Sequence, residues 1–194
     1  MMRRKLFQIL LFLLIFPLFV SGCASPYLLM KQKNTIELQP NEGVVLFSAR
    51  FNNKERVDQK NIFWTTSVTL QEVNQYKAYG AKRVLLIPSP GQNYIRQDDL
   101  FLFSLKLPRG TYKITSLDGL FRSLFSDQTF VGVNKLFDVV PGRISYAGRL
   151  EIDFSCGLSI HETRVEDKFG EDDGRFKNGY PALQNRSIVK DLIY

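Results

Sequence analysis

The sequence predicts a mainly β protein, namely an antiparallel β-sandwich of about seven to eight strands with a short C-terminal helix. Three observations predict this fold class. Apolar and polar residues alternate, as they do in half-buried strands, through most of residues 43–165. Turns that contain Pro and Gly separate the apolar segments. No strand–helix–strand crossover is visible between those segments, so a parallel sheet is not expected.

The first strands are predicted from residues that would share one face of an extended chain. These faces are formed by Val45, Phe47, Ala49 and Phe51; by Ile62, Trp64, Thr66, Val68 and Leu70; by Phe101, Phe103, Leu105 and Leu107; and by Tyr112 and Ile114. Residues 83–87 predict a short, more fully buried strand between the second and third of these sets.

Four further strands are expected after residue 114. Residues 130–133 and 137–139 indicate two short ones, and residues 158–165 indicate the last. The longest alternation lies between them, and we expect its apolar residues to share one face: Ile144, Tyr146, Leu150, Ile152 and Phe154. Gly148 falls in phase with this set and indicates a bend or a bulge.

Two turns repeat the same chemistry, with Pro followed by Gly between apolar strands. They occupy residues 107–112 and 140–144. Pro presets the first turn position, and Gly accepts the positive φ that follows. We expect both turns to join neighbouring antiparallel strands.

The remaining segments are expected to be loops or helical turns. Residues 52–61 and 88–99 are predicted loops, and residues 118–128 have a spacing that suits one or two helical turns. Acidic residues at 171–173, Lys177 and Gly179 predict a short helix. Ile188, Val189, Leu192 and Ile193 predict a final amphipathic turn that packs on the sandwich.

The N-terminus carries a different signal. Three basic residues at positions 3–5 precede an apolar run over residues 6–19, and Ser21 and Gly22 lead directly into Cys23. The run is too short for a good transmembrane helix, since spanning takes ~20 apolar residues. This segment resembles the signal peptide of a bacterial lipoprotein. The resemblance implies cleavage after residue 22 and lipidation of Cys23, with a diacylglyceryl group on its thiol and, in many bacteria, an acyl chain such as palmitate on its amine.

The domain boundaries follow from that resemblance. Residues 1–22 would be the cleaved signal peptide, residues 23–34 the lipidated N-terminus and linker, and residues 35–194 the sandwich domain with its helical segment. Two alternatives are an uncleaved membrane anchor and an ordinary secretory signal. Ala24 and Ser25 lack the aspartate that resembles an inner-membrane retention signal. The implied location is the cell envelope, at the outer membrane facing the periplasm in a Gram-negative cell.

Charge and cysteine content limit the function classes. Removing residues 1–22, which hold three basic and no acidic residues, leaves 172 residues with 23 Lys and Arg against 19 Asp and Glu. The basic residues are scattered, whereas a nucleic-acid protein is expected to show a basic stripe, so no nucleic-acid partner is predicted. Lipidation of Cys23 would leave Cys156 without a disulfide partner, as a small buried hydrophobe.

A family resemblance rests on the turns. The sequence LPRGTY at residues 107–112 and the sequence FDVVPGRISYAGRL at residues 137–150 are similar to those of small bacterial lipoproteins. The mature domains of these lipoproteins resemble the prealbumin-like or carboxypeptidase-regulatory type of β-sandwich. The resemblance implies a mostly noncatalytic module and assigns no site residue.

The residues that carry chemistry form no recognisable catalytic set. His161 and Cys156 could form a nucleophile and base, but an odd separation along one strand places them on opposite faces. One His and one Cys are too few for zinc. The acidic segment 166–173 could bind calcium, although its spacing differs from an EF-hand and Asp172 and Asp173 suit a helix start. We therefore predict no catalytic, metal-binding or cofactor-binding residue.

The sequence thus predicts a noncatalytic, lipid-anchored envelope protein that binds another envelope protein or a cell-wall polymer. Two alternatives are an envelope glycan hydrolase that uses paired carboxylates and a carrier of small ligands or lipids.

Overall fold

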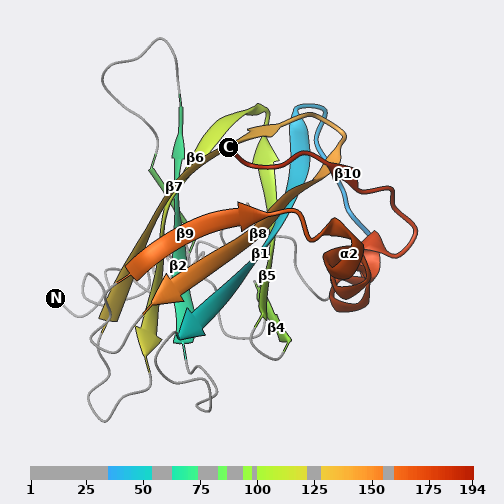
Figure 1. The fold of residues 1–194 in the computed structure, drawn as a ribbon. Helices are drawn as coiled ribbons and strands as arrows, with labels where there is room; N and C mark the ends of the chain where they lie inside the picture. Colours follow the sequence, from blue (N-terminus) through green and yellow to red (C-terminus); the bar gives the residue numbers. More distant parts are fainter. Residues whose placement is uncertain are drawn as a thin grey trace, which may run out of the picture.

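A computed structural model describes residues 35–53, 63–73, 83–86, 94–97, 100–121, 128–154 and 160–194 of the protein. Their strands form two sheets (Figure 1). The six-stranded sheet contains β1 (Glu42–Asn53), β4 (Tyr94–Gln97), β5 (Leu100–Pro108), β8 (Ile144–Phe154), β9 (Ile160–Glu166) and β10 (Val189–Lys190). The four-stranded sheet contains β2 (Phe63–Glu72), β3 (Arg83–Leu86), β6 (Gly110–Phe121) and β7 (Gln128–Val139). Two helical elements follow β9, namely α2 (Phe169–Gly179) and the 3-10 helix η2 (Pro181–Leu183).

The two sheets pack face to face around an aromatic-rich core, so the predicted β-sandwich is confirmed. The expected inward-facing residues of β1, β5, β6 and β7 are buried in this core. Phe47 stacks on Phe103 across β1 and β5, with ring centroids 4.6 Å apart. Tyr112 stacks on Phe137 across β6 and β7 at 5.8 Å. Such pairs stabilise the fold beyond the area they bury.

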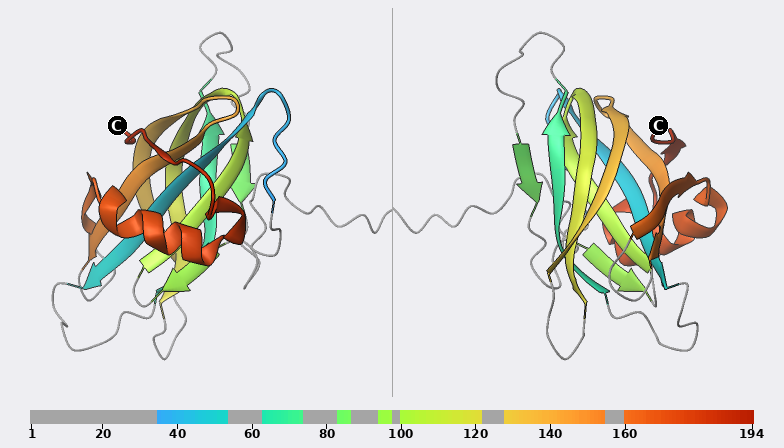
Figure 2. Two further views of the ribbon diagram at one scale, coloured as in Figure 1. Left: turned by 90° about the vertical axis from the view of Figure 1, so that its right-hand side faces the viewer. Right: turned by 60° about the vertical axis from the view of Figure 1, so that its left-hand side comes forward.

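The helical elements add a third layer on the outer face of the six-stranded sheet (Figure 2). Phe176, Tyr180 and Leu183 pack there against side chains of β1, β5 and β8, including Leu46 and Leu102. The six-stranded sheet is therefore buried on both faces at this end. This explains why β1 and β5 carry almost continuous apolar runs in addition to the alternation that the sequence analysis used.

The expectation of purely antiparallel strands is wrong for two pairs. β8 pairs parallel to β1 on one side and parallel to β10 on the other. A parallel neighbour requires a long crossover, and here the crossover between β1 and β8 includes the whole four-stranded sheet instead of a helix. Seven strands have seven or more residues, and β3, β4 and β10 have four, four and two. β3 is the short strand predicted at residues 83–87, whereas the two short strands predicted at 130–133 and 137–139 form the single strand β7.

Both Pro-Gly turns connect the two sheets, so the prediction that they join neighbouring strands is wrong. The first leads from β5 to β6 and the second from β7 to β8. In the second turn the Arg143 amide donates to the Val140 carbonyl at 3.2 Å, and Gly142 has a φ of 70°. These features fit a type II turn. Turn chemistry fixes the local change of direction, but it does not decide which sheet the next strand joins.

Gly148 lies in a β-bulge, as expected, and the bulge reverses the faces of β8. Leu46 pairs with Tyr146 but Ser48 pairs with Arg149, so β8 holds one extra residue. Ile144 and Tyr146 therefore face the helices, whereas Leu150 and Ile152 face the inter-sheet core. The prediction that these apolar residues share one face is wrong, because a one-residue insertion inverts every later side chain.

The predicted C-terminal helix is confirmed as α2, with Glu171 and Asp172 in its first turn and Lys177 in its last. Residues 188–193 contain the strand β10 and are not the predicted amphipathic turn. The Ile193 amide donates to the Ala147 carbonyl at 2.8 Å, and Tyr194 exchanges two backbone hydrogen bonds with Leu136 of β7, at 2.8 and 3.1 Å. This segment therefore links the edges of the two sheets.

Three other segments differ from the predictions where they are described. Residues 118–121 and 128 belong to β6 and β7 and are not helical, because the β6–β7 ladder continues through them. Residues 94–97, predicted as loop, form β4, and residues 52–53 complete β1. Cys23, the rest of residues 1–34 and Cys156 lie outside the described residues. In the described part of the chain, no helix combines the length and apolar character needed to cross a membrane.

Candidate functional site

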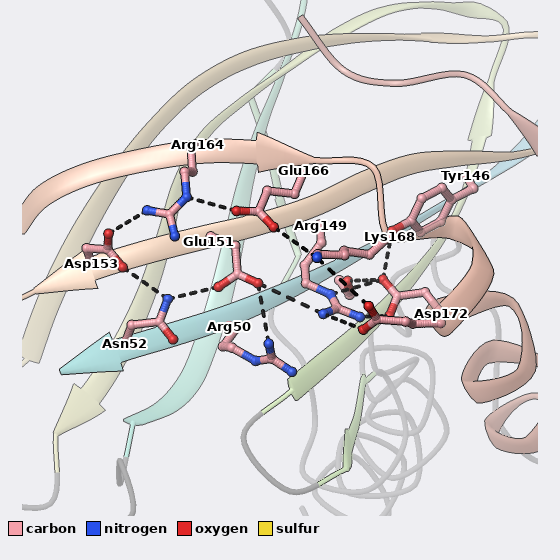
Figure 3. A network of polar contacts seen from close by, with 12 residues as sticks. Arg50, Asn52, Tyr146, Arg149, Glu151, Asp153, Arg164, Glu166, Lys168 and Asp172 are labelled. Atoms are coloured by element: carbon pink, nitrogen blue, oxygen red, sulfur yellow. Dashed lines mark hydrogen bonds and ion pairs between the residues drawn. The ribbon is translucent and has the colours of Figure 1, made fainter. Parts of the chain in front are cut away.

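The most extensive group of interacting charged side chains lies on the outer face of the six-stranded sheet (Figure 3). We call this group the polar band. It comprises Ser48, Arg50 and Asn52 of β1; Tyr146, Arg149, Glu151 and Asp153 of β8; Arg164 and Glu166 of β9; and Lys168, Glu171 and Asp172 at the start of α2. The bulge at Gly148 creates the band, because it turns the polar residues after it outward.

The register places the polar residues of β1 and β8 directly opposite one another. Ser48 pairs with Arg149, Arg50 with Glu151, and Asn52 with Asp153. Side chains opposite one another on the same face are within contact distance. The outer face is thus apolar beneath α2 and η2, and polar farther along the same strands.

An ion pair between Arg149 and Asp172 joins the sheet to the helix. Both side chains are fully buried, and the guanidinium group donates through Nη2 to Oδ1 and through Nε to Oδ2, the latter at 3.3 Å. The Asp172 carboxylate also accepts hydrogen bonds from Tyr146 Oη at 2.7 Å and from Ser48 Oγ at 2.6 Å. The Arg149 Nη1 atom lies 3.1 Å from Glu171 Oε2.

The surroundings favour charged arginine and neutral tyrosine in this cluster. Burial acts to lower the pKa of Arg149, but the hydrogen bond and charge of Asp172 more than offset it and raise that pKa. Burial raises the pKa of Tyr146 well above its usual value, and its hydrogen bond to Asp172 raises it further. Proton transfer near neutral pH is therefore unfavourable for both groups, and their geometry suits a structural contact.

Glu151 and Asp153 form a carboxylate pair, which is the arrangement that a glycan hydrolase requires. Asn52 Nδ2 donates to Glu151 Oε2 at 2.8 Å and to Asp153 Oδ1 at 3.0 Å, so one amide bridges the two groups. Arg50 lies 3.6 Å from Glu151, and Arg164 lies 2.5 Å from Asp153. The two carboxylates are buried and already contact guanidinium groups, whereas a general acid must reach the substrate.

The band continues to α2 through partly exposed ion pairs. Arg164 Nε donates to Glu166 Oε1 at 3.0 Å, and Lys168 lies 3.4 Å from Glu166 Oε2. The hydrogen bonds to Glu166 and Asp153 raise the pKa of Arg164, and the bond from Arg164 lowers the pKa of Glu166. Lys168 also lies 3.8 Å from Glu171, which contacts Arg149. The charges thus compensate one another along the band.

The carboxylates of the acidic segment 166–173 do not converge on one point. They face four separate groups of cations instead: Glu166 faces Arg164 and Lys168, Asp167 faces Lys190, Glu171 and Asp172 face Arg149, and Asp173 faces Lys177. No group of three metal-ligating side chains lies together among the residues that the structure describes. The arrangement of this segment is that of an ion-pair network.

Arg149 was not predicted as the partner of Asp172, which was interpreted as a helix-terminal charge. One signal was present, because Arg149 interrupts an apolar strand. His161 lies in β9, and its proposed partner Cys156 lies outside the described residues, as does Cys23.

Comparisons with known proteins supply no family. No family model matches the chain, and no curated protein matches it. Among solved structures, the chain is similar to a leucine-rich repeat protein from Bacteroides thetaiotaomicron, with 13% identity and a TM-score of 0.36. The match covers 59% of this chain and 14% of that one. A likeness at this TM-score carries no argument about fold family or function.

Proposed function

We propose that this protein is a noncatalytic, lipid-anchored protein of the cell envelope that binds another envelope component. The anchor is Cys23, and the location is the outer membrane facing the periplasm if the cell is Gram-negative. The partner is an envelope protein or a cell-wall polymer. The similarity of its turns to prealbumin-like lipoprotein domains supports the same class of function.

The observation that carries the proposal is the pairing of the polar band. Its carboxylates each contact a cation, and Arg149 and Asp172 hold α2 on the sheet. This supports a rigid three-layer scaffold in preference to an acid–base site. Rigid sandwiches commonly present recognition residues on their loops. We assign recognition to the sheet edges and to the parts of the predicted loops 52–61 and 88–99 that lie outside β1 and β4.

Two experiments test the proposal. The first compares the chain with its Cys23→Ala variant by membrane fractionation and by mass spectrometry of the processed N-terminus. We expect the chain that retains Cys23 to gain a lipid mass and to associate with membranes, and we expect the Cys23→Ala variant to do neither. The second is affinity purification after mild crosslinking of the lipidated protein in its own cells. We expect the chain to recover one envelope component, and we expect replacement of residues 54–61 by a Gly-Ser segment to abolish that recovery. Recovery of no component contradicts a binding role.

The glycan hydrolase remains a second candidate, because the Asn52 bridge holds Glu151 and Asp153 close together. Its test is release of soluble fragments from purified cell wall by the chain and by the variants Glu151→Gln and Asp153→Asn. Release that both substitutions abolish in folded protein would favour the enzyme. Carriage of a lipid inside the sandwich is less well supported, because Phe47, Phe103 and Phe137 fill the inter-sheet space.

A further inference from the structure

A shallow depression lies between the β7–β8 turn and the segment that leads into β10. Residues 140–144 form one side, and Arg186, Ser187 and Val189 form the other. Two guanidinium groups, of Arg143 and Arg186, therefore flank a surface that also offers the Ser187 hydroxyl. Guanidinium groups present planar sets of N–H donors that match the oxygens of a phosphate.

The positive charge of this depression is available to a ligand. Arg143 Nη1 lies 3.6 Å from Asp191 Oδ2, but both side chains are about two-fifths exposed, at 41% and 43%. Water screens an exposed ion pair of this kind, so an anionic ligand can readily take the place of Asp191 beside Arg143. Arg186 is exposed and forms no ion pair with any other described residue. The nearby Glu42 carboxylate is engaged by Lys106 at 3.4 Å.

The chain that leads toward Cys23 lies beside this depression. The Gly142 amide donates to the Glu42 carbonyl at 2.8 Å, just before β1 extends into the sheet. Ile36 and Leu38 pack against the cluster that contains Ile144 and Ile188. Figure 1 shows residues 35–41 rising next to α2 toward the turn that precedes β8. Residues 35–41 therefore connect the side of the fold beside α2, where the chain leads back toward Cys23, to the turn that carries Arg143.

The linker limits the distance between this side and a membrane. Eleven residues, 24–34, separate Cys23 from the first described residue. Fully extended, a chain of this length reaches at most roughly 40 Å. A tethered domain experiences a high effective concentration of the surface to which it is tethered, so weak contacts suffice to orient it.

We propose that Arg143 and Arg186 bind the phosphate groups of anionic lipid headgroups and hold the tethered domain in one orientation on the membrane. This inference rests on the proposed lipid anchor at Cys23. The anchor supplies attachment, and the two arginines supply direction, since a single attachment point leaves the domain free to rotate. Each arginine near an anionic surface favours the bound orientation on the order of fivefold.

The test uses the lipidated chain reconstituted into vesicles of phosphatidylcholine alone or of phosphatidylcholine with phosphatidylglycerol. Phenylglyoxal modifies accessible arginines, and peptide mass spectrometry gives the rate for each one. We expect modification of Arg143 and Arg186 to slow about fivefold in the anionic vesicles only. Arg175, which lies on α2 and donates to Gln97 at 3.5 Å, is the internal control and should react equally in both.

Variants and competing anions make the test decisive. Arg186→Gln should remove most of the protection of Arg143, whereas Arg175→Gln should not. Equal rates in the two vesicle types, or equal protection of Arg175, would overturn the proposal. Protection by inorganic phosphate in neutral vesicles would instead assign the depression to a free anion. The mass of the processed N-terminus reports the lipid on Cys23 separately, so failure of the anchor and failure of the arginine contact give different results.

Discussion

Arg149 and Asp172 are both fully buried, and they form an ion pair that joins β8 to the first turn of α2. Two hydroxyl groups, of Tyr146 and Ser48, complete the hydrogen bonding of the same carboxylate. A buried charge without its partner is strongly unfavourable, so each of these two residues requires the other. The attachment of the helical layer to the sheet depends on this contact together with the apolar residues around it.

Asp172→Asn should destabilise the protein by about 3–5 kcal/mol, because it removes the fully buried counter-ion of Arg149 and leaves only Glu171, which is 59% exposed, in close contact with that charge. Urea unfolding followed by circular dichroism measures the change. The matched control is Asp173→Asn, which removes a partly exposed ion pair to Lys177 at 2.8 Å. This control substitution should lower the free energy of unfolding by less than about 0.5 kcal/mol. Equal effects of the two substitutions would mean that burial of the pair contributes nothing.

Tyr146→Phe should cost about 1–3 kcal/mol, because it deletes one donor to the Asp172 carboxylate and retains the ring. Combined with Asp172→Asn, its effect should be smaller than it is alone, since the two residues share one hydrogen bond. A double-mutant cycle from urea unfolding gives the coupling. Strict additivity would contradict the shared contact.

Gly148→Ala should destabilise the fold by more than about 1–3 kcal/mol. Gly148 has a φ of 111°, and a Cβ atom there would lie 2.8 Å from Val165 Cγ1 and 3.4 Å from the Glu166 carbonyl oxygen. Backbone strain and a close contact therefore add together. Gly174→Ala is the control, because nothing lies within 4 Å of its added Cβ and it is within α2. That substitution should stabilise by up to about 1 kcal/mol, and thermal unfolding compares the two.

Phe47→Ala should cost about 3–5 kcal/mol, because Phe47 is fully buried and stacks on Phe103 between the sheets. Phe130→Ala is the matched control, since the Phe130 side chain is 63% exposed at the start of β7. Its substitution should change the free energy of unfolding by less than about 0.5 kcal/mol. A large effect at Phe130 would indicate an interface that covers it.

Stability should fall in acid as Glu166 and Asp167 bind protons. The Arg164 hydrogen bond lowers the pKa of Glu166, and the Lys190 hydrogen bond lowers the pKa of Asp167. A carboxyl group with a lowered folded-state pKa stabilises the protein above its unfolded pKa, and that contribution is lost as pH falls through the folded value. The loss should therefore occur below about pH 4.5.

Urea midpoints measured across that acid range test the linkage. The double variant Glu166→Gln, Asp167→Asn should show a shallower fall of the midpoint with pH. Added salt should reduce that fall in the original chain, because both ion pairs are at least partly exposed. An unchanged slope in the variant would show that other carboxyl groups control acid stability. Glu162→Gln is a control on β9, since Glu162 is 62% exposed and lies 3.8 Å from Arg164.

The strands and the core were predictable because their signal is local. Alternation placed Phe47, Phe103 and Tyr112 in the core, and the acidic first turn with Lys177 marked α2. The polar band was not predictable to the same degree. Asp172 and Arg149 are 23 residues apart, and Ser48 lies 124 residues from Asp172. No local sequence pattern predicts which of many charged residues will contact one another when they are so far apart in the sequence.

The amino-acid sequence by itself determined the β-rich character, the bulge at Gly148, the Pro-Gly turns and the C-terminal helix, because each depends on the conformational preferences of a few consecutive residues. Only the tertiary structure decided that the turns lead from one sheet to the other, that β1 lies parallel to β8, and that α2 covers the sheet. Those choices depend on how complete apolar faces are buried against one another, and such burial sums contacts from the whole chain.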